Sequence, residues 1–298
     1  MSQTRLNRGR AATVAVIAGL AAGALAIPAA EVATGTATAA HATSWRTARS
    51  SPTNAEPVKA ARVTCPEDSV PYAGGGAVDY GPAGNGGAAL TAIVPDLAAR
   101  SVVVTATAPP GQSADWAVVA FAICSTAEQP AVVVRSGAGT ATAVCPHDQA
   151  LFGAGFRVAG DPAVGHVTGI DLNPEVTGVR VTAGGPGGAT AEVTAIAVCQ
   201  TAGLETKLLH AGNDNPGWPK LVTRQDNDEL LKPYATGATV TGPEAATLDA
   251  VVPASDDGVS WARGTLYAGT APQPATAAAD GDDDGSVSLE TTLIGTFH

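Results

Sequence analysis

An aspartate-rich loop near the C-terminus has the residue spacing of a cation site. Asp280, Asp282 and Asp284 stand at positions 1, 3 and 5 of the loop, and Gly285 follows at position 6. This alternation places three carboxylates on one side of a tight turn, and the glycine permits the bend that calcium loops require. The spacing therefore makes these three aspartates candidate calcium ligands, with an affinity of about 10⁻⁴–10⁻³ M, as in extracellular modules.

The same loop also fits a second interpretation. Position 12 of a calcium loop carries a bidentate glutamate, but here Thr291 stands at that position and Glu290 comes one residue early. No helical pattern flanks the loop. A charged hairpin tip between two strands explains the sequence equally well, and both interpretations stay open. Apart from calcium, the sequence indicates no cofactor.

Signals for catalysis are sparse. The chain has neither a Gly-x-Ser-x-Gly elbow nor a His-Glu-x-x-His helix. We interpret His147 as part of a solvated turn, and His166, between Asp161 and Asp171, as a surface histidine. We therefore predict no catalytic residue and a non-enzymatic protein. The histidines outside the N-terminal segment are His147, His166, His210 and His298.

Aromatic residues offer one candidate ligand contact. Trp218 lies in the long irregular segment Asn-Asp-Asn-Pro-Gly-Trp-Pro, where a side chain is free to meet a ligand such as a sugar. Trp116 begins an apolar strand and is expected to be buried. Three further aromatic residues occupy matching positions at strand starts and are expected in the core: Tyr72, Phe152 and Tyr234.

The four cysteines favour disulfides over a metal site. Cys65 and Cys145 each precede a proline, whereas Cys124 and Cys199 each end an apolar strand. Four cysteines allow three pairings, and a repeat in the sequence favours Cys65–Cys124 with Cys145–Cys199. Each bond would contribute about 4 kcal/mol through chain entropy. A zinc site is the competing interpretation, but no two cysteines have the spacing of a ligand pair.

The elements that position these residues follow an internal repeat. Pro95, Pro174 and Pro253 each close an apolar run and are evenly spaced along the sequence. Gly75, Gly155 and Gly237 recur in matching runs before them. Period-two alternation with glycine and proline turns predicts an all-β fold. We expect three repeats of about four strands each, packed as in a β-prism, with a two-sheet sandwich as the alternative.

The predicted organisation divides the chain into six parts. The third repeat lacks cysteines and therefore a disulfide, and the second is expected to begin with a connecting strand at Ala131 to Ser136. The parts are a signal peptide (1–42), a disordered leader (43–60), repeat 1 (61–125), repeat 2 with its connecting strand (126–200), a long loop (201–226) and repeat 3 (227–298).

The N-terminal segment 1–42 has the pattern of an export signal. Three arginines precede an uninterrupted apolar run from Ala11 to Ile27, and small residues follow, which favours cleavage after Ala42. An uncleaved membrane anchor is the alternative, although this apolar run is at the short limit for a membrane span. We expect a secreted, extracellular protein.

Charge narrows the range of partners. The whole chain has a formal net charge of −11, and removing segment 1–42 takes away three arginines and one glutamate, which leaves −13. A surface this acidic is a poor partner for nucleic acid or for an anionic membrane. The remaining partners are cell wall, polysaccharide or an extracellular protein.

The first two repeats resemble those of uncharacterised secreted proteins of actinobacteria. The shared pattern is Cys-Pro, a Gly-rich strand at Gly74–Gly76, a turn, and then Trp-x-Val-x-Ala-x-Ala-x-Cys ending at Cys124. The resemblance implies export and supports the disulfide pairing, and it brings no enzymatic activity with it. We expect a non-enzymatic extracellular binding or surface-structural protein. A lectin-like carbohydrate-binding protein is the alternative, and a secreted hydrolase is third.

A calcium titration separates the two interpretations of the aspartate-rich loop. If the loop binds calcium, neutralisation of its clustered carboxylates raises the melting temperature of the mature protein in millimolar calcium relative to chelator. Equal melting temperatures in the two solutions would identify the loop as a charged hairpin tip.

Overall fold

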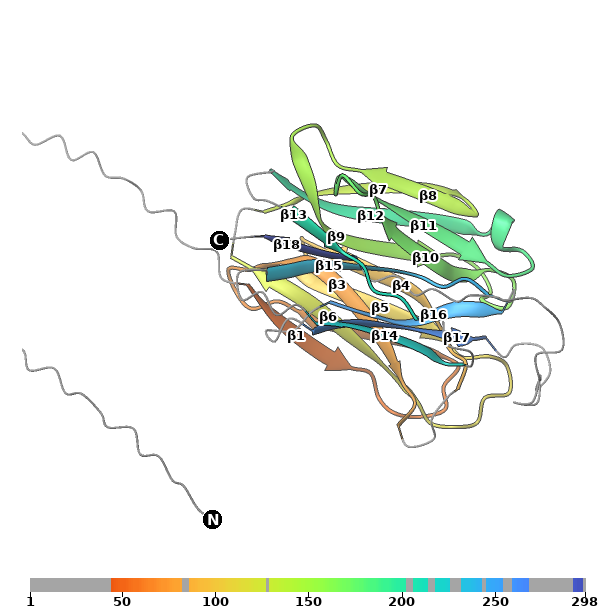
Figure 1. Cartoon of the computed structure of the whole chain (residues 1–298). Coiled ribbons are helices and arrows are strands. Elements are labelled where there is room, and N and C mark those ends of the chain that lie inside the picture. Colours follow the sequence, from red (N-terminus) through yellow and green to blue (C-terminus); the bar gives the residue numbers. More distant parts are fainter. Residues whose placement is uncertain are drawn as a thin grey trace, which may run out of the picture. The chain divides into compact units, whose positions relative to one another are not determined.

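The computed structural model of this protein is built of β-strands (Figure 1). It describes residues 44–81, 86–126, 129–201, 206–213, 218–225, 232–242, 245–253, 259–267 and 292–296. Asp280, Asp282 and Asp284 lie outside these residues, as does the expected signal peptide. Within the described part of the chain, no helix is long and apolar enough to cross a membrane.

The strands form three six-stranded antiparallel sheets. In order across sheet I lie β1 (Ser44–Ser50), β6 (Ala117–Ser125), β3 (Val70–Asp79), β16 (Ala246–Val252), β17 (Val259–Leu266) and β14 (Lys220–Gln225). Across sheet II lie β2 (Val58–Thr64), β5 (Ser101–Thr107), β4 (Ala89–Asp96), β9 (Gln149–Val158), β12 (Glu192–Thr201) and β7 (Ala131–Ala138). Across sheet III lie β8 (Thr140–Val144), β11 (Gly178–Gly184), β10 (His166–Leu172), β15 (Lys232–Thr239), β18 (Thr292–Thr296) and β13 (Thr206–Leu209).

Each sheet joins two groups of three strands that come from different parts of the sequence (Figure 1). The two groups meet where β4 pairs with β9, β10 with β15, and β16 with β3, and two residue pairs form each of these junctions. The all-β prediction is confirmed. There are three sheets, so the two-sheet alternative is wrong, and each sheet holds more strands than the expected four.

One hydrophobic core draws on strands of all three sheets. Strand β2 alternates exposed and buried residues along its length, as its period-two sequence predicts. Strand β16 is buried at every residue, because both of its faces are covered. The core consists mainly of alanine, valine, leucine and isoleucine, and Trp116 is fully buried within it, as predicted.

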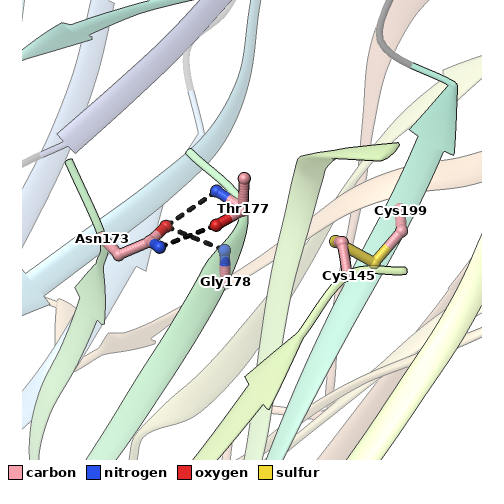
Figure 2. The surroundings of a disulfide bond; sticks show 5 residues. All are labelled: Cys145, Asn173, Thr177, Gly178 and Cys199. Carbon is pink, nitrogen blue, oxygen red and sulfur yellow. Dashed lines mark hydrogen bonds between the residues drawn. A yellow bond between two sulfur atoms is a disulfide. The ribbon is translucent and has the colours of Figure 1, made fainter. Parts of the chain in front are cut away.

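Two disulfides connect different sheets, and the predicted pairing is confirmed. Cys65 follows β2 of sheet II and is bonded to Cys124 in β6 of sheet I. Cys145 follows β8 of sheet III and is bonded to Cys199 in β12 of sheet II (Figure 2). These bonds keep neighbouring sheets together and indicate an oxidising environment.

The loop between β10 and β11, close to the second disulfide, is held by a single asparagine (Figure 2). Asn173 Oδ1 accepts hydrogen bonds from the backbone N–H groups of Thr177 at 2.7 Å and Gly178 at 2.8 Å. Its Nδ2 donates to Thr177 Oγ1 at 2.8 Å. The backbone of the same loop accepts from Cys145 N, so the turn and the disulfide support each other.

The three sheet junctions share one steric requirement. A Cβ atom on Gly155 would stand 2.5 Å from the carbonyl oxygen of Ile93, and one on Gly75 would stand 2.6 Å from that of Val251. Gly237 is equally close to the carbonyl of Ile170. A real Cβ does not come this near to a backbone oxygen, so the crossing strands approach each other only because these residues are glycines.

The proline spacing does not follow the register of the junctions. Pro95 and Pro253 each pack against the glycine of the adjoining strand, but Leu172 takes this place at the third junction. Pro174 comes shortly after Leu172 in the chain. Pro174 therefore occupies a different structural position from the other two prolines. The three glycines, in contrast, occupy the same position at all three junctions.

The segment 43–60 is not the disordered leader that we expected. Its first part forms strand β1, which pairs with β6 along its whole length. Its second part packs on Trp116, whose Nε1 donates to the carbonyl of Glu56 at 2.9 Å, while Lys59 Nζ lies 5.1 Å from the centre of the ring. The sequence shows no apolar alternation here because β1 is an edge strand with several exposed side chains.

The expected long loop at 201–226 also contains strands. Strand β13 pairs with β18, and β14 pairs with β17, each at the edge of a sheet. The short apolar stretches in this segment gave too weak a periodicity to predict them. A strand is present where the connecting strand was predicted, as β7, and it pairs with β12 at the edge of sheet II.

A single added methyl group tests the junctions. Gly155→Ala is expected to destabilise the protein by about 1–3 kcal/mol, because the new Cβ overlaps the carbonyl of Ile93. The matched control is Gly212→Ala, since a Cβ at Gly212 meets nothing within 4 Å. Urea denaturation of the oxidised protein measures both. Equal unfolding midpoints for the two variants would refute the steric requirement.

Candidate functional site

The structure places the predicted site residues in different environments. All four cysteines are bonded in pairs, whereas the three aspartates of the candidate calcium loop lie outside the described residues. Trp218 is half-buried and packs against the core beside Gly264, instead of standing free in the loop. It retains an exposed part, so its proposed ligand contact stays a prediction.

The two histidines that we interpreted as exposed, His147 and His166, differ in their burial. The side chain of His147 is 95% exposed, as expected for a solvated turn. His166 is only 2% exposed, so its interpretation as a surface residue is wrong. It begins β10, donates a hydrogen bond from Nδ1 to the carbonyl of Pro162 at 3.0 Å, and stacks on Tyr267. The aspartates on either side of His166 in the sequence had suggested an exposed loop.

A buried charge cluster lies at the junction between β3 and β16. Asp249 is completely buried, and both of its carboxylate oxygens accept from Arg263 Nε at 2.9 Å. Arg263 Nη2 also donates to the carbonyl of Val78 on β3 at 2.6 Å. The Tyr80 hydroxyl lies 3.4 Å from Asp249, and its ring lies below the guanidinium group. The cluster therefore connects three strands of sheet I.

Threonines occupy the same place in the other two sheets. Asp249 is the bulged residue of β16, and the bulged residues of β4 and β10 are Thr91 and Thr168. Each threonine hydroxyl donates to a backbone carbonyl of the neighbouring strand, at 3.2 and 3.3 Å respectively. At the bulged position, the sheets of the other two junctions thus have a neutral threonine hydrogen bond, whereas sheet I has the charged Asp249. The β3–β16 junction of sheet I pairs strands from distant parts of the sequence.

Burial dominates the electrostatics of this cluster. Loss of hydration raises the pKa of Asp249 to about 6, against the opposing effect of the Arg263 guanidinium. Burial also raises the pKa of Tyr80, and the charge of Asp249 adds to that rise. Because the carboxylate already accepts two hydrogen bonds and is fully buried, the cluster acts as a structural connection and offers no accessible group to a ligand.

The outward-facing side chains differ among the sheets. One cross-strand row, at the same place in the register of each sheet, shows this most clearly. The row is Arg62, Val103 and Val94 in sheet II, Thr142, Arg180 and Asp171 in sheet III, and Thr223, Trp261 and Val252 in sheet I, where Val252 is buried and packs against Trp261. One backbone arrangement thus presents a cationic and apolar row, an ion-paired row and an aromatic row.

Sheet II has an open hollow over this row, with a volume of about 410 Å³. Arg62 and Arg157 lie on opposite sides of the hollow, on β2 and β9. Arg62 donates one side-chain hydrogen bond to Ser101, and the exposed side chain of Arg157 makes no hydrogen bond or ion pair within the described part of the chain. The remaining lining residues are Thr91, Ala92, Val94, Asp96, Val103, Thr105 and Val158.

Sheet III has a hollow at the matching place, of about 430 Å³. Here the charges neutralise each other, because Arg180 pairs with Asp171 at 3.2 Å. Asp171 also accepts a hydrogen bond from Thr239 of the adjoining strand. The two hollows therefore lie over the same cross-strand row but differ in their available charge.

Among the residues that the structure describes, no group of three histidine, cysteine or acidic side chains is placed to hold a metal ion. No protein-family model matches the chain, and no curated protein matches it significantly.

Sequence reasoning missed both arginines of the sheet II hollow and the buried cluster. Asp249 interrupts the apolar run from Leu248 to Val252, and a charge inside such a run was an available signal of burial with a partner. Arg62 and Arg157 belong to strands that are far apart in sequence. Only the strand pairing places them over one hollow.

The raised pKa of Asp249 predicts a pH dependence of stability. An aspartate has a pKa of 3.8 when exposed, so between about pH 4 and pH 6 the folded protein binds the extra proton. The contribution of Asp249 to stability is therefore greatest at low pH and falls by roughly 3 kcal/mol as the pH rises through 6.

Urea denaturation of the native protein and of Asp249→Asn between pH 4 and pH 7.5 measures this difference. The native protein is expected to lose stability relative to the variant as the pH rises. Parallel stability profiles for the two proteins would show that Asp249 keeps its ordinary pKa.

Proposed function

We propose that this protein is a secreted, non-enzymatic binding module whose ligand contacts lie on the outer faces of its sheets. The observation that carries the proposal is that the three sheet junctions have the same residue type, whereas the three outer rows have different side chains. The junction glycines all meet the same steric requirement, whereas the matching outward rows carry cationic, ion-paired and aromatic side chains. Different side chains on a common scaffold support a role in recognition.

A pseudo-threefold arrangement belongs to this proposal. We infer that the chain contains three repeats, each of which contributes three strands to one sheet and three to the next, in the manner of a β-prism. The cyclic succession of the β4–β9, β10–β15 and β16–β3 junctions supports this view. Such an architecture would display one outer face per junction.

The extracellular location is supported by two independent features. The two disulfides suit an oxidising compartment, and the arginine-led apolar run of segment 1–42 has the pattern of a cleaved signal. We therefore propose that the functional protein is residues 43–298 and that it meets cell wall, polysaccharide or another extracellular protein.

A lectin-like function is the second candidate, and the aromatic face of sheet I favours it. Trp261 and Phe121 are half-exposed and pack on a floor of small side chains, formed by Ala77, Ala250 and Val252. The Arg46 guanidinium lies 5.3 Å from the centre of the Phe121 ring. Half-exposed rings over a flat floor suit the apolar face of a sugar.

Retention on insoluble polysaccharides and purified cell wall tests the proposal. Residues 43–298 are expected to be retained in a saturable manner that a soluble ligand competes. One substitution in each outer row identifies the face responsible: Arg62→Gln, Asp171→Asn or Trp261→Ala. Loss of the responsible side chain is expected to weaken binding by about tenfold or more.

Two outcomes separate the candidate functions. Retention that is lost in Trp261→Ala or Trp218→Ala, and is competed by neutral sugar, supports the lectin-like function. If residues 43–298 are retained on none of the matrices, the proposal of a polysaccharide-binding or wall-binding module is wrong.

A further inference from the structure

We infer that the hollow of sheet II binds an acidic oligosaccharide, through the guanidinium groups of Arg62 and Arg157. This inference rests on the proposed function, since it assigns a ligand class to one of the outer faces. It follows from the charge, the lining and the position of the hollow.

The two arginines have unused donors that face a common space. A guanidinium group carries five N–H donors, and the only side-chain hydrogen bond of Arg62 in the described residues goes to Ser101 Oγ at 3.0 Å. Arg157 uses none of its donors within the described part of the chain. Planar guanidinium groups match carboxylates in a bidentate manner, so the free donors favour a carboxylate-bearing ligand.

The spacing of the arginines suits a ligand longer than one carboxylate. Strands β5 and β4 lie between β2 and β9, so the arginine backbones are separated by three strand spacings, about 14 Å. Both side chains line the same hollow. A short oligomer with carboxylates on successive units meets both guanidinium groups at once.

The acidic surface of the protein limits the ligand to a short one. The mature chain has a net charge of −13, which repels a long polyanion. At physiological ionic strength, charges beyond about 8 Å are screened, so the local charge decides the binding of a short ligand. Within the hollow, Asp96 opposes the two arginines, and one positive charge remains.

The lining and the position favour a sugar over an acidic peptide. Hydroxyls of Thr91 and Thr105 alternate with the apolar side chains of Val94 and Val103, which matches the mixed polar and apolar faces of a sugar ring. Peptides often add as a strand to a free sheet edge, but the floor of this hollow is formed by β5 and β4, which are paired on both sides. A ligand over these two strands therefore meets side chains, and only β2, at the rim of the hollow, is an edge strand.

The matching hollow of sheet III provides an internal control. Its Arg180 is already paired with Asp171, so the positive charge in this second hollow is neutralised before any anion arrives. Binding of an acidic sugar should therefore depend on Arg62 and Arg157 and be independent of Arg180.

Calorimetric titration of residues 43–298 with trigalacturonate tests the inference. The double variant Arg62→Gln/Arg157→Gln is expected to bind at least tenfold more weakly, because each charge-assisted hydrogen bond is worth about a factor of ten. Arg180→Gln is expected to bind as the native protein does. Unchanged melting temperatures confirm that the variants are folded, since all three side chains are at the surface.

Each alternative outcome has a separate meaning. Equal binding of triglutamate would overturn the assignment to a sugar, and equal binding of neutral maltotriose would overturn the role of the carboxylate. If the protein is retained on a polysaccharide matrix but does not bind trigalacturonate, the acidic ligand is wrong and the proposed function stands. If it is retained on no matrix and does not bind the trimer, both fail.

Discussion

The close approach of two backbones at each sheet junction is the constraint on which this structure depends. Only two residue pairs connect the two halves of each sheet, and the strands then cross with a carbonyl directly over a glycine. Any larger residue at Gly75, Gly155 or Gly237 would push the halves apart. The core, the bulges and the sheet order all depend on these three contacts, because the junctions connect strands that are far apart in the sequence.

The junction between β16 and β3 differs from the others, since it joins the later part of the chain to the earlier part. A buried ion pair, Asp249 with Arg263, replaces the threonines of the other two junctions. A buried pair contributes little net stability, but a wrong partner would leave a charge unpaired and buried. The pair therefore favours this junction over a mispairing of similar strands. Arg46 adds a second contact across sheet I, from β1 to the carbonyl of Pro253.

Much of this fold was predictable from the sequence, because alternation reports directly on burial in a strand. The all-β class and the buried Trp116 followed from local pattern, and the disulfide pairing followed from the internal repeat. The edge strand β1 was not predictable, since its exposed side chains carry no apolar period. The sheet II hollow was equally hidden, because Arg62 and Arg157 are neighbours only through strand pairing. Asp249 gave a local signal, because it is a charge within an apolar run. Its partner Arg263 could not be predicted, because only the pairing of β16 with β17 places the two residues together.

The pairing of β3 with β16 joins the two halves of sheet I, and an engineered disulfide tests this pairing directly. Ala77 and Ala250 are paired across this junction, and both are buried small residues. Directly opposed residues of antiparallel strands lie within the Cα separation that a disulfide bridges. In the double variant Ala77→Cys/Ala250→Cys, mass spectrometry of the oxidised protein is expected to find a third disulfide between these two residues within one chain. Free thiols at both positions, or disulfides only between chains, would contradict the pairing of β3 with β16 in sheet I.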